Sequence, residues 1–255
     1  MSEAPGFVVA IPARYASTRL PGKALLPIAG EPMVLHVARR ALASGASQVV
    51  VATDDARIAD ALRPAAVTVL MTRSDHQSGT DRLAECAEQM GWADSTIVVN
   101  LQGDEPLAPP GGVRAVAHAL AGSDAPMATL AVPISGTHEL FDPNCVKVVV
   151  DRSGNAMYFS RAPLPWARDA FAAAREFLPP SGTFLRHIGI YAYRAGFLRA
   201  FAHLAPTPLE QTEALEQLRA LEHGHRIAVR LAPDPFPGGV DSPEDLARVR
   251  ALLGA

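Results

Sequence analysis

Short apolar runs alternate with helix-like segments through the first half of the chain, and this alternation restricts the possible folds more than any other feature. Four runs predict strands, at 7–11, 48–53, 67–71 and 96–102. Four segments with helical periodicity separate or follow them, at 32–45, 54–62, 78–90 and 112–120. Continuous Val/Ile/Leu runs are typical of parallel strands buried on both faces. We therefore expect an α/β fold with a mostly parallel sheet and helices on both faces.

The second half of the chain has a different pattern. Further strands are predicted at 127–134, 145–151, 156–160, 187–193 and 226–232. The turn residues RSGN (152–155) predict a hairpin between two of them. Residues 161–186 are rich in Pro and Arg and form a long excursion, either a lid or a subunit arm. Helices are predicted at 209–224 and at 242–253, the second with Ser242 as N-cap, Pro243 at the first helical position and Asp245 at the third.

Composition narrows the class of protein. A length of 255 residues suits one large domain or two small ones, and we expect a single domain over 1–255. A net charge of −3 argues against a general nucleic-acid-binding protein. Two distant cysteines suggest a reducing compartment and no structural zinc. Without a signal-peptide pattern or a membrane-length apolar run, the expectation is a cytoplasmic protein that contacts neither membrane nor nucleic acid.

The loop PARYASTRLPGK (12–23) follows the first predicted strand and carries three cations and no acid. Arginine binds phosphate oxygens through two donors and lysine acts as a point charge, so Arg14, Arg19 and Lys23 suit a triphosphate. The loop matches neither the GxxxxGK[ST] nor the GxGxxG pattern. The alternative is a solvated basic loop that makes only surface ion pairs.

Two acidic residues are candidates for a metal site. In NLQGDEP (100–106), Gly103 permits a sharp turn after a strand, and Asp104 then lies at the carboxyl end of the sheet. Magnesium binds through one or two carboxylates, with waters and phosphate oxygens completing its shell. Asp241 precedes the last helix and has no capping duty. The alternatives are a simple turn at Asp104 and a favourable helix-dipole charge at Asp241.

The remaining polar segments point to a base and a sugar. Loops 12–23, 72–78 and 103–106 all follow strands, so they should open on one edge of the sheet. The segment TRSDHQSGTDR (72–82) has donors and acceptors for a base edge, although its composition alone favours a well-capped loop with His76 at the surface. Glu210, Glu213 and Gln217 form one polar stripe of the predicted helix, suited to a polyhydroxylated ligand or simply to solvent.

Taken together, these segments resemble a known family. PARYASTRLPGK, TRSDHQSGTDR, NLQGDEP, FSRAPLPW, FLRHIGIYAY, PLEQTEALEQLRALEHG and GGVDSPEDL occur in the order seen in the 3-deoxy-manno-octulosonate cytidylyltransferases. The resemblance runs from about residue 7 to 252. It implies a Rossmann-like nucleotidyltransferase fold, a homodimer, and Mg²⁺-dependent transfer of CMP from CTP to 3-deoxy-D-manno-octulosonate (Kdo), which activates Kdo for lipopolysaccharide biosynthesis. It also implies that the hairpin and arm region 135–195 forms the dimer interface.

The resemblance further implies roles for individual residues. Catalysis and triphosphate binding would fall to Arg14, Arg19, Lys23 and Asp104, and the metal to Asp104 and Asp241. The CTP site would also include Ala13, Thr72, Arg73, Ser78 and Gly79. The acid sugar would contact Gln102, Arg161, His187, Tyr191, Glu210 and Gln217. From the residues alone, Arg161 and His187 are either partners of a carboxylate or members of ordinary ion pairs.

Three alternatives remain at this stage. The nearest is a cytidylyltransferase for another acidic sugar, such as sialic acid. A second is a nucleotide-sugar sensor with this fold and no catalysis, which the intact Asp104, Asp241 and cationic loop disfavour. A dinucleotide oxidoreductase is weaker still, because the glycine fingerprint is missing.

Overall fold

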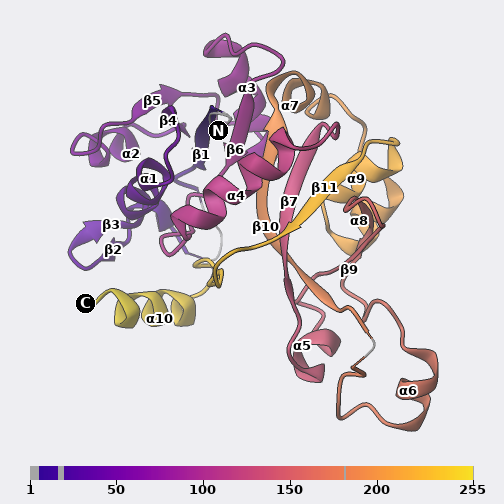
Figure 1. Ribbon diagram of the computed structural model, residues 1–255. Coiled ribbons are helices and arrows are strands. Elements are labelled where there is room, and N and C mark those ends of the chain that lie inside the picture. The colour runs from indigo at the N-terminus through magenta and orange to yellow at the C-terminus, as the bar shows by residue number, and fades with distance from the viewer. Residues whose placement is uncertain (1–5, 17–19, 181, 255) are drawn as a thin grey trace, which may run out of the picture.

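The computed structural model describes residues 6–16, 20–180 and 182–254 of the chain, so the predicted triphosphate residue Arg19 lies outside the described residues. Within them, the chain forms a nine-stranded sheet, with a main path β11–β7–β10–β6–β1–β4–β5, and a separate two-stranded hairpin (Figure 1). The strands are β1 (Phe7–Ala13), β2 (Pro27–Ile28), β3 (Glu31–Pro32), β4 (Gln48–Thr53), β5 (Thr68–Met71), β6 (Ile97–Asn100), β7 (Met127–Pro133), β8 (Lys147–Val150), β9 (Ala156–Ser160), β10 (Leu185–Arg194) and β11 (Ile227–Leu231).

Helices connect most of these strands. The 3₁₀ helix η1 spans Lys23–Leu25. The α-helices are α1 (Met33–Ala43), α2 (Ala56–Ala61), α3 (Gly79–Gln89), α4 (Pro110–Ala121), α5 (Thr137–Phe141), α6 (Arg168–Ala173), α7 (Ala195–Phe201), α8 (Pro208–Glu213), α9 (Gln217–Glu222) and α10 (Pro243–Leu253). Short elements that the sequence did not predict are the β2–β3 hairpin, η1, α5, α6 and α7.

The sheet has a parallel half and a mixed half. Strand β1 pairs in parallel with β4 and β6, and β4 pairs in parallel with β5. Strand β10 is inserted antiparallel between β6 and β7, and β11 runs parallel to β7. The predicted fold class is confirmed, and the antiparallel β10 is the feature that its apolar run alone could not reveal.

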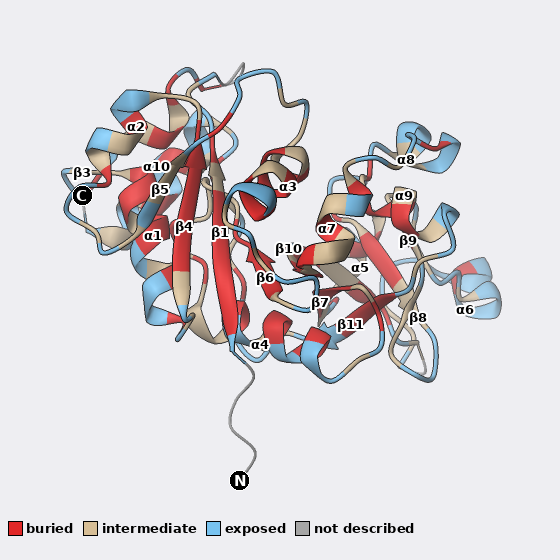
Figure 2. Ribbon diagram, turned by 90° about the horizontal axis from the view of Figure 1, so that it is seen from above, coloured by how far each residue is buried: buried red, intermediate tan, exposed pale blue. Residues whose placement is uncertain are grey.

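Alternate residues of β1 supply two separate cores, which explains why its sequence is a continuous apolar run. Val9 and Ile11 pack with α1, α2 and α4 on one face, whereas Val8 and Ala10 pack with α3, α7 and α9 on the other. Figure 2 shows β1 and β4 as buried along most of their length, with the helices outside them. Both faces are therefore covered, as predicted.

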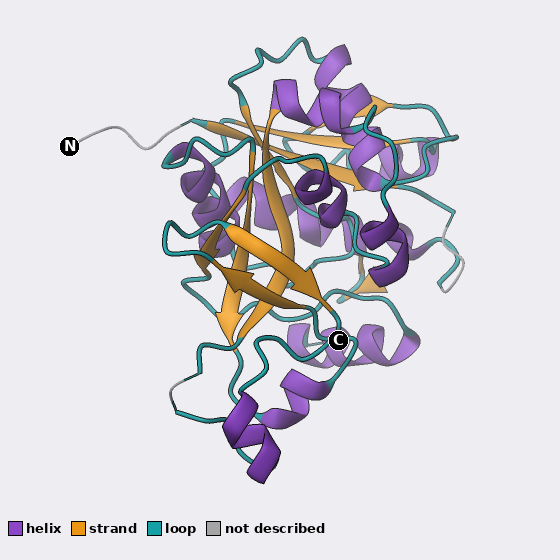
Figure 3. Cartoon of the chain, turned by 90° about the vertical axis from the view of Figure 1, so that its right-hand side faces the viewer, coloured by secondary structure: helices purple, strands orange, loops and turns teal. Residues whose placement is uncertain are grey.

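The mixed half extends into an arm. The start of β10 pairs with β8 as well as with β7, and the predicted RSGN turn joins β8 and β9 as an antiparallel hairpin with Gly154 at φ 82°. Helices α5 and α6 lie at the far end of this arm, away from the parallel strands (Figures 1 and 3). Phe171 and Phe184 are the buried rings of a small core there. The excursion 161–186 thus contains α6 and belongs to the arm.

The prediction of one continuous helix over 209–224 was wrong. The chain breaks between α8 and α9, where Ala214 adopts a left-handed conformation with φ 52°. The break lets Leu215 enter the core, while the Glu213 carboxylate accepts a hydrogen bond from Ser160 at 2.5 Å. Tertiary contacts therefore override the helical periodicity of this segment.

The last helix forms as its sequence predicts. Ser242 accepts a hydrogen bond from Asp245 N at 3.2 Å, the Asp245 side chain accepts one from Ser242 N at 3.1 Å, and Pro243 occupies the first turn. No helix in the described part of the chain has the length and hydrophobicity needed to cross a bilayer.

Candidate active site

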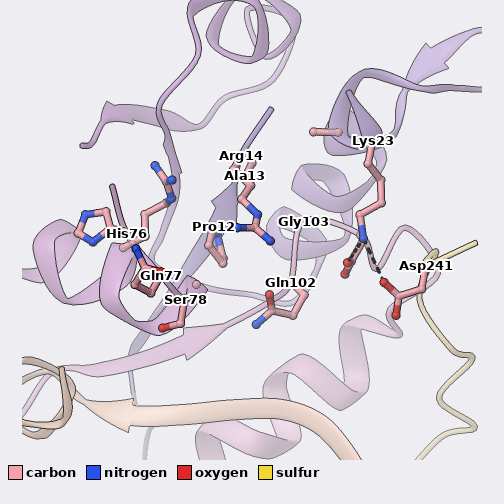
Figure 4. Close-up of a pocket in the computed structure, with 14 residues that line it drawn as sticks. Pro12, Ala13, Arg14, Lys23, His76, Gln77, Ser78, Gln102, Gly103 and Asp241 are labelled. Atoms are coloured by element: carbon pink, nitrogen blue, oxygen red, sulfur yellow. Dashed lines mark hydrogen bonds and ion pairs between the residues drawn. The ribbon is translucent and has the colours of Figure 1, made fainter. Parts of the chain in front are cut away.

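A cavity of about 290 Å³ opens at the carboxyl ends of β1 and β6 (Figure 4). Its lining comes from the three loops that the sequence predicted to share an edge and from the segment before α10. The lining residues are Pro12, Ala13, Arg14, Lys23, Ala24, His76, Gln77, Ser78, Gly79, Arg82, Gln102, Gly103, Asp104 and Asp241. The prediction that loops 12–23, 72–78 and 103–106 open on one edge is therefore confirmed.

Lys23 links the two predicted metal ligands. Its Nζ lies 2.5 Å from Asp104 Oδ2 and 3.3 Å from Asp241 Oδ1, and Figure 4 shows these contacts as dashed lines. The sequence could not say whether Asp241 approaches Asp104. The structure brings both carboxylates to one ammonium, although 137 positions separate them in the chain (241 minus 104).

A third acid stands behind this pair. Burial raises the pKa of Glu105 to about 8, with further contributions from the charges of Asp104 and Asp241. Within the described residues, Glu105 Oε2 is buried and has no hydrogen-bond partner. With a pKa of about 8, Glu105 is largely protonated at neutral pH, so the negative charge facing Lys23 comes from Asp104 and Asp241.

This donor set fits Mg²⁺. Asp104 and Asp241 offer hard carboxylate oxygens, and two protein carboxylates are a usual number for this ion because water and phosphate oxygens complete its octahedron. No group of three or more His, Cys, Asp or Glu side chains with metal-binding geometry occurs within residues 6–16, 20–180 and 182–254. An all-protein cage is thus absent there, in keeping with a shared protein–nucleotide site.

Close backbone approach shapes the floor of the cavity. A side chain at Gly103 would place its Cβ 2.8 Å from the carbonyl oxygen of Pro12, so only glycine lets the β6 loop meet the end of β1. Next to it, the Arg57 guanidinium covers the Tyr15 ring at 3.5 Å from the centroid. These contacts hold the segment that carries Arg14.

The loop before α3 is held by buried polar contacts. Ser78 caps α3 with the reciprocal hydrogen bonds of a capping box. Arg82, only 3% exposed, donates to Thr72 Oγ1 at 2.5 Å and to Asp54 Oδ2 at 2.7 Å. Arg73 projects outward and pairs with Asp75 at 3.2 Å. Ser78 and Gly79 therefore line the cavity, whereas Thr72 and Arg73 do not.

His76 is not the surface residue that the composition of its loop suggested. Its side chain is 5% exposed and bonds to Glu85, which also accepts a hydrogen bond from Arg73 N at 3.2 Å. Sequence reasoning likewise assigned no role to Arg82, although both residues lie within the quoted 72–82 segment. The one sequence signal for the burial of His76 is Glu85, an acid nine positions later on α3. That spacing brings the two side chains together only because the loop folds back on the helix.

Of the residues predicted to contact the sugar, only Gln102 lines the cavity. Its amide donates to Asn100 Oδ1 at 3.1 Å, and Asn100 lies opposite Tyr191 in the β6–β10 register. Tyr191 in turn lies 5.4 Å from the His187 ring, measured between centroids. Gln102, Tyr191 and His187 thus form a row that leads from the cavity across the antiparallel strand.

His187 is neutral at physiological pH, because burial lowers its pKa to about 3, with a further contribution from Arg186. Thr129 Oγ1 lies 3.0 Å from His187 Nε2 and 2.7 Å from the carbonyl oxygen of Ile190. Since the hydroxyl donates its one hydrogen to a carbonyl, it accepts from an Nε2–H. His187 therefore presents Nδ1 as an acceptor and supplies no positive charge.

Two of the other predicted sugar residues, Arg161 and Glu210, have partners in the fold, whereas the Gln217 amide nitrogen has none among the described residues. Arg161 donates through Nε to the carbonyl oxygen of Glu213 at 2.7 Å and through Nη1 to that of Pro143 at 3.0 Å. Glu210 pairs with Arg219 at 2.5 Å. Gln217 is 6% exposed, and its Nε2 has no hydrogen-bond partner among the described residues.

Glu216, which sequence reasoning passed over, connects the two halves of the site. It is adjacent to the α8–α9 break and accepts a hydrogen bond from Thr80 Oγ1 at 2.6 Å. Burial raises the pKa of Glu216, and hydrogen bonds from Thr80 and Ser78 oppose that rise. The first turn of α3 is thereby joined to the segment that carries Gln217.

Comparisons with known proteins agree with this geometry. The family model described as cytidylyltransferase matches residues 8–227. A 3-deoxy-manno-octulosonate cytidylyltransferase from Stenotrophomonas maltophilia is 63% identical, covering 98% of this chain and 97% of that protein. One from Xanthomonas campestris pv. campestris is 62% identical over 97% of this chain and 100% of its own length.

Two solved structures are also similar to the chain over nearly its whole length. The structure of a CMP:2-keto-3-deoxy-manno-octonic acid synthetase complexed with CTP is 42% identical, with a TM-score of 0.88 over 98% of this chain and 99% of that chain. A nucleotidyl transferase from Methanothermobacter thermautotroptrophicus, 16% identical with a TM-score of 0.60 over 98% of each chain, shows the shared fold alone. The chain therefore belongs to the cytidylyltransferase family and, within it, to the 3-deoxy-manno-octulosonate cytidylyltransferases.

Proposed function

We propose that this protein transfers CMP from CTP to Kdo, giving CMP-Kdo and pyrophosphate, and so activates Kdo for lipopolysaccharide biosynthesis. The observation that carries the proposal is the cavity at the carboxyl ends of β1 and β6, where Lys23 meets Asp104 and Asp241. The relationship to a CTP-bound synthetase identifies the nucleotide that suits this cavity.

Asp104 and Asp241 would hold Mg²⁺, the cofactor proposed for this site. When bound, the ion polarises the α-phosphate and neutralises charge on the triphosphate. Both carboxylates already contact one cation, the Lys23 ammonium. This arrangement supports the proposal that they would bind one metal ion together.

The cationic loop would bind the triphosphate. Arg14 and Lys23 line the cavity, and Arg19 would join them from the same loop. In the reaction, the C2 hydroxyl oxygen of Kdo forms a bond to the α-phosphorus in line with the bond to the departing pyrophosphate, which breaks. Positive groups placed where charge builds on the leaving group lower the barrier more than groups that bind substrate and transition state equally. We assign that role to Arg14, Arg19 and Lys23.

The base would lie against the loop before α3. Ser78, Gly79 and the backbone near Ala13 line the same cavity as the cationic loop. Arg82, with Thr72 and the loop backbone at Arg73, would keep this surface fixed, since its guanidinium bonds to both. A rigid surface of donors and acceptors is what discrimination between bases requires.

The acid sugar would occupy the space beyond Gln102, towards Tyr191 and His187. A neutral His187 would accept a hydrogen bond at Nδ1 from a hydroxyl group of the sugar. The buried Gln217 Nε2, which lacks a partner among the described residues, would offer a second donor. Arg161 and Glu210 would contact the sugar only after exchanging partners that they now hold.

We also propose that the protein acts as a homodimer in the cytoplasm, with the 135–195 region at the interface. Two aromatic side chains of the arm support an interface there, because Phe177 is 83% exposed and Trp166 is 46% exposed. Large apolar side chains that are exposed together on one part of a protein surface are typical of a surface that another chain covers.

The experiment that tests the function is a pyrophosphate-release assay with Mg²⁺, Kdo and each of CTP, UTP, GTP and ATP. We expect rapid release with CTP and release at least about tenfold slower with the others. Replacing Kdo by sialic acid should abolish release. Activity with sialic acid but not Kdo would overturn the proposed sugar, and no release with any pair would overturn the catalytic function.

A further inference from the structure

The last helix packs on the small hairpin and not on the main sheet. Ile28 of β2, with Leu246 and Val249 of α10, belongs to a satellite core separate from the two sheet cores. Arg250 Nε also donates to the carbonyl oxygen of Pro27 at 3.0 Å, and Figure 1 shows α10 beside β2 and β3. The helix that follows Asp241 is therefore anchored outside the sheet that carries Asp104.

The segment before α10 nevertheless reaches the sheet loop by close backbone contact. Val240 N donates to the carbonyl oxygen of Asp104 at 2.9 Å. A Cβ on Gly239 would lie 3.0 Å from that same oxygen and 3.6 Å from Asp104 Oδ1. The position of Asp241 relative to Asp104 thus depends on a tight approach that a larger residue at 239 would disturb.

Arg248 of α10 fixes this segment from its other side. Its Nη2 lies 3.1 Å from the carbonyl oxygen of Gly238, 3.3 Å from that of Gly239 and 3.0 Å from Asp245 Oδ1. The second oxygen of Asp245 accepts a hydrogen bond from Asp241 N at 3.2 Å. One guanidinium therefore holds the carbonyls of Gly238 and Gly239, just upstream of Asp241, and the carboxylate that accepts from the Asp241 amide.

We propose that Arg248 is a positioning residue for Asp241, setting the distance between the two magnesium ligands from the C-terminal helix without contacting any substrate. This inference rests on the proposed function only in taking Asp104 and Asp241 as the ligands of the ion. Groups that orient metal ligands from outside the coordination shell commonly change metal affinity by about 10–100-fold when removed. Arg248 is 40% exposed at its side chain, so we expect a value near the lower end.

The test compares Arg248→Ala, Arg248→Lys and Gly239→Ala with Arg250→Ala as the matched control. Arg250 lies on the same helix and also donates to a backbone carbonyl, but that carbonyl belongs to the hairpin. Mn²⁺ binding to the protein alone is measured by electron paramagnetic resonance, and the Mg²⁺ concentration for half-maximal rate is measured with CTP and Kdo. Thermal unfolding is recorded for every variant.

We expect Arg248→Ala and Gly239→Ala to bind Mn²⁺ about tenfold more weakly and to need correspondingly more Mg²⁺. KM for Kdo should stay unchanged, Arg248→Lys should recover part of the affinity, and Arg250→Ala should match the wild type. Equal metal affinity in Arg248→Ala and Arg250→Ala would overturn the proposal, as would a lower melting temperature in Arg248→Ala without a change in metal binding.

The Mn²⁺ measurement needs no nucleotide or sugar, so it separates this inference from the proposed function. A wild-type protein that binds Mn²⁺ but releases no pyrophosphate would overturn the function and leave the positioning role supported by the variants. If Arg248→Ala fails to fold, Arg248→Lys and Gly239→Ala decide the same question.

Discussion

The parallel and the antiparallel parts of the sheet contribute to the site in different ways. At the carboxyl ends of β1 and β6, the loops surround an open cavity. Charged side chains that line it are already in contact, as Lys23 is with Asp104. Along β10 and just after β9, the candidate side chains His187 and Arg161 are packed and partnered. Under the proposed function, the nucleotide half would therefore be preformed, whereas Arg161 and Glu210 in the sugar half would have to exchange existing contacts for new ones.

The largest expected effect is in the preformed half. Asp104→Asn keeps the shape of the side chain but removes the charge that would hold Mg²⁺, so we expect turnover to fall by about three orders of magnitude or more. Pyrophosphate release measures the loss, and circular dichroism should show an unchanged fold. The control is Asp124→Asn, an exposed acid distant from this cavity in sequence. Near wild-type kcat in Asp104→Asn would refute the metal role.

Lys23→Met should have the next largest effect. It removes a charge that acts on the leaving pyrophosphate, and we expect kcat/KM for CTP to fall by about 100-fold. The chain's only other lysine, Lys147, is buried, so the surface control is Arg63→Met, whose side chain is 80% exposed. If both variants turn over CTP equally well, the triphosphate assignment is wrong.

Lys147→Met probes the packed half. The Lys147 side chain is fully buried, and its Nζ donates to the carbonyl oxygens of Asp142, Cys145 and Arg161 at 2.8, 2.5 and 2.7 Å. Leaving these acceptors unpaired should reduce the free energy of unfolding by about 2–4 kcal/mol. Since Arg161 is one of the tethered residues, KM for Kdo should rise more than KM for CTP.

Denaturant unfolding and initial-rate kinetics check this prediction, with Arg152→Met, an exposed change at the hairpin turn, as the control. An equal rise in both KM values would remove the distinction between the two halves. If Lys147→Met were as stable as the control, the buried ammonium group would not stabilise the arm.

The smallest expected effect concerns the pH dependence of stability. His187 binds a proton near pH 6.5 in the unfolded chain, but burial lowers its pKa to about 3 in the fold. The unfolded state therefore binds more protons between these values, so stability falls as the pH falls, by up to about 1.4 kcal/mol per pH unit. His187→Gln should flatten this slope between about pH 6.5 and about pH 5 in denaturant titrations. An unchanged slope would show that His187 is charged in the fold.

The same contrast explains how much could be predicted from the sequence. The parallel strands and Ser242 at the start of α10 followed from apolar runs and from local capping chemistry, which act over a few residues. The order of these strands also placed the three loops at one edge, so the location of the cavity could be predicted.

The remaining features depend on contacts between distant segments. The helix break at Ala214 arises because Leu215 and Glu213 have partners on other elements, and no local pattern records those partners. The burial of His76 against Glu85 depends on how a loop folds back on a helix. The approach of Asp241 to Asp104 depends on α10 docking against a hairpin that was itself not predicted.

The position of Asp241 in the chain also has a consequence for biosynthesis. Every strand of the described sheet precedes it, since β11 ends at Leu231. A ribosome therefore finishes the entire sheet, with Arg14, Lys23 and Asp104, before it adds Asp241. The contact of Lys23 with Asp241 consequently forms only after every strand of that sheet has been synthesised.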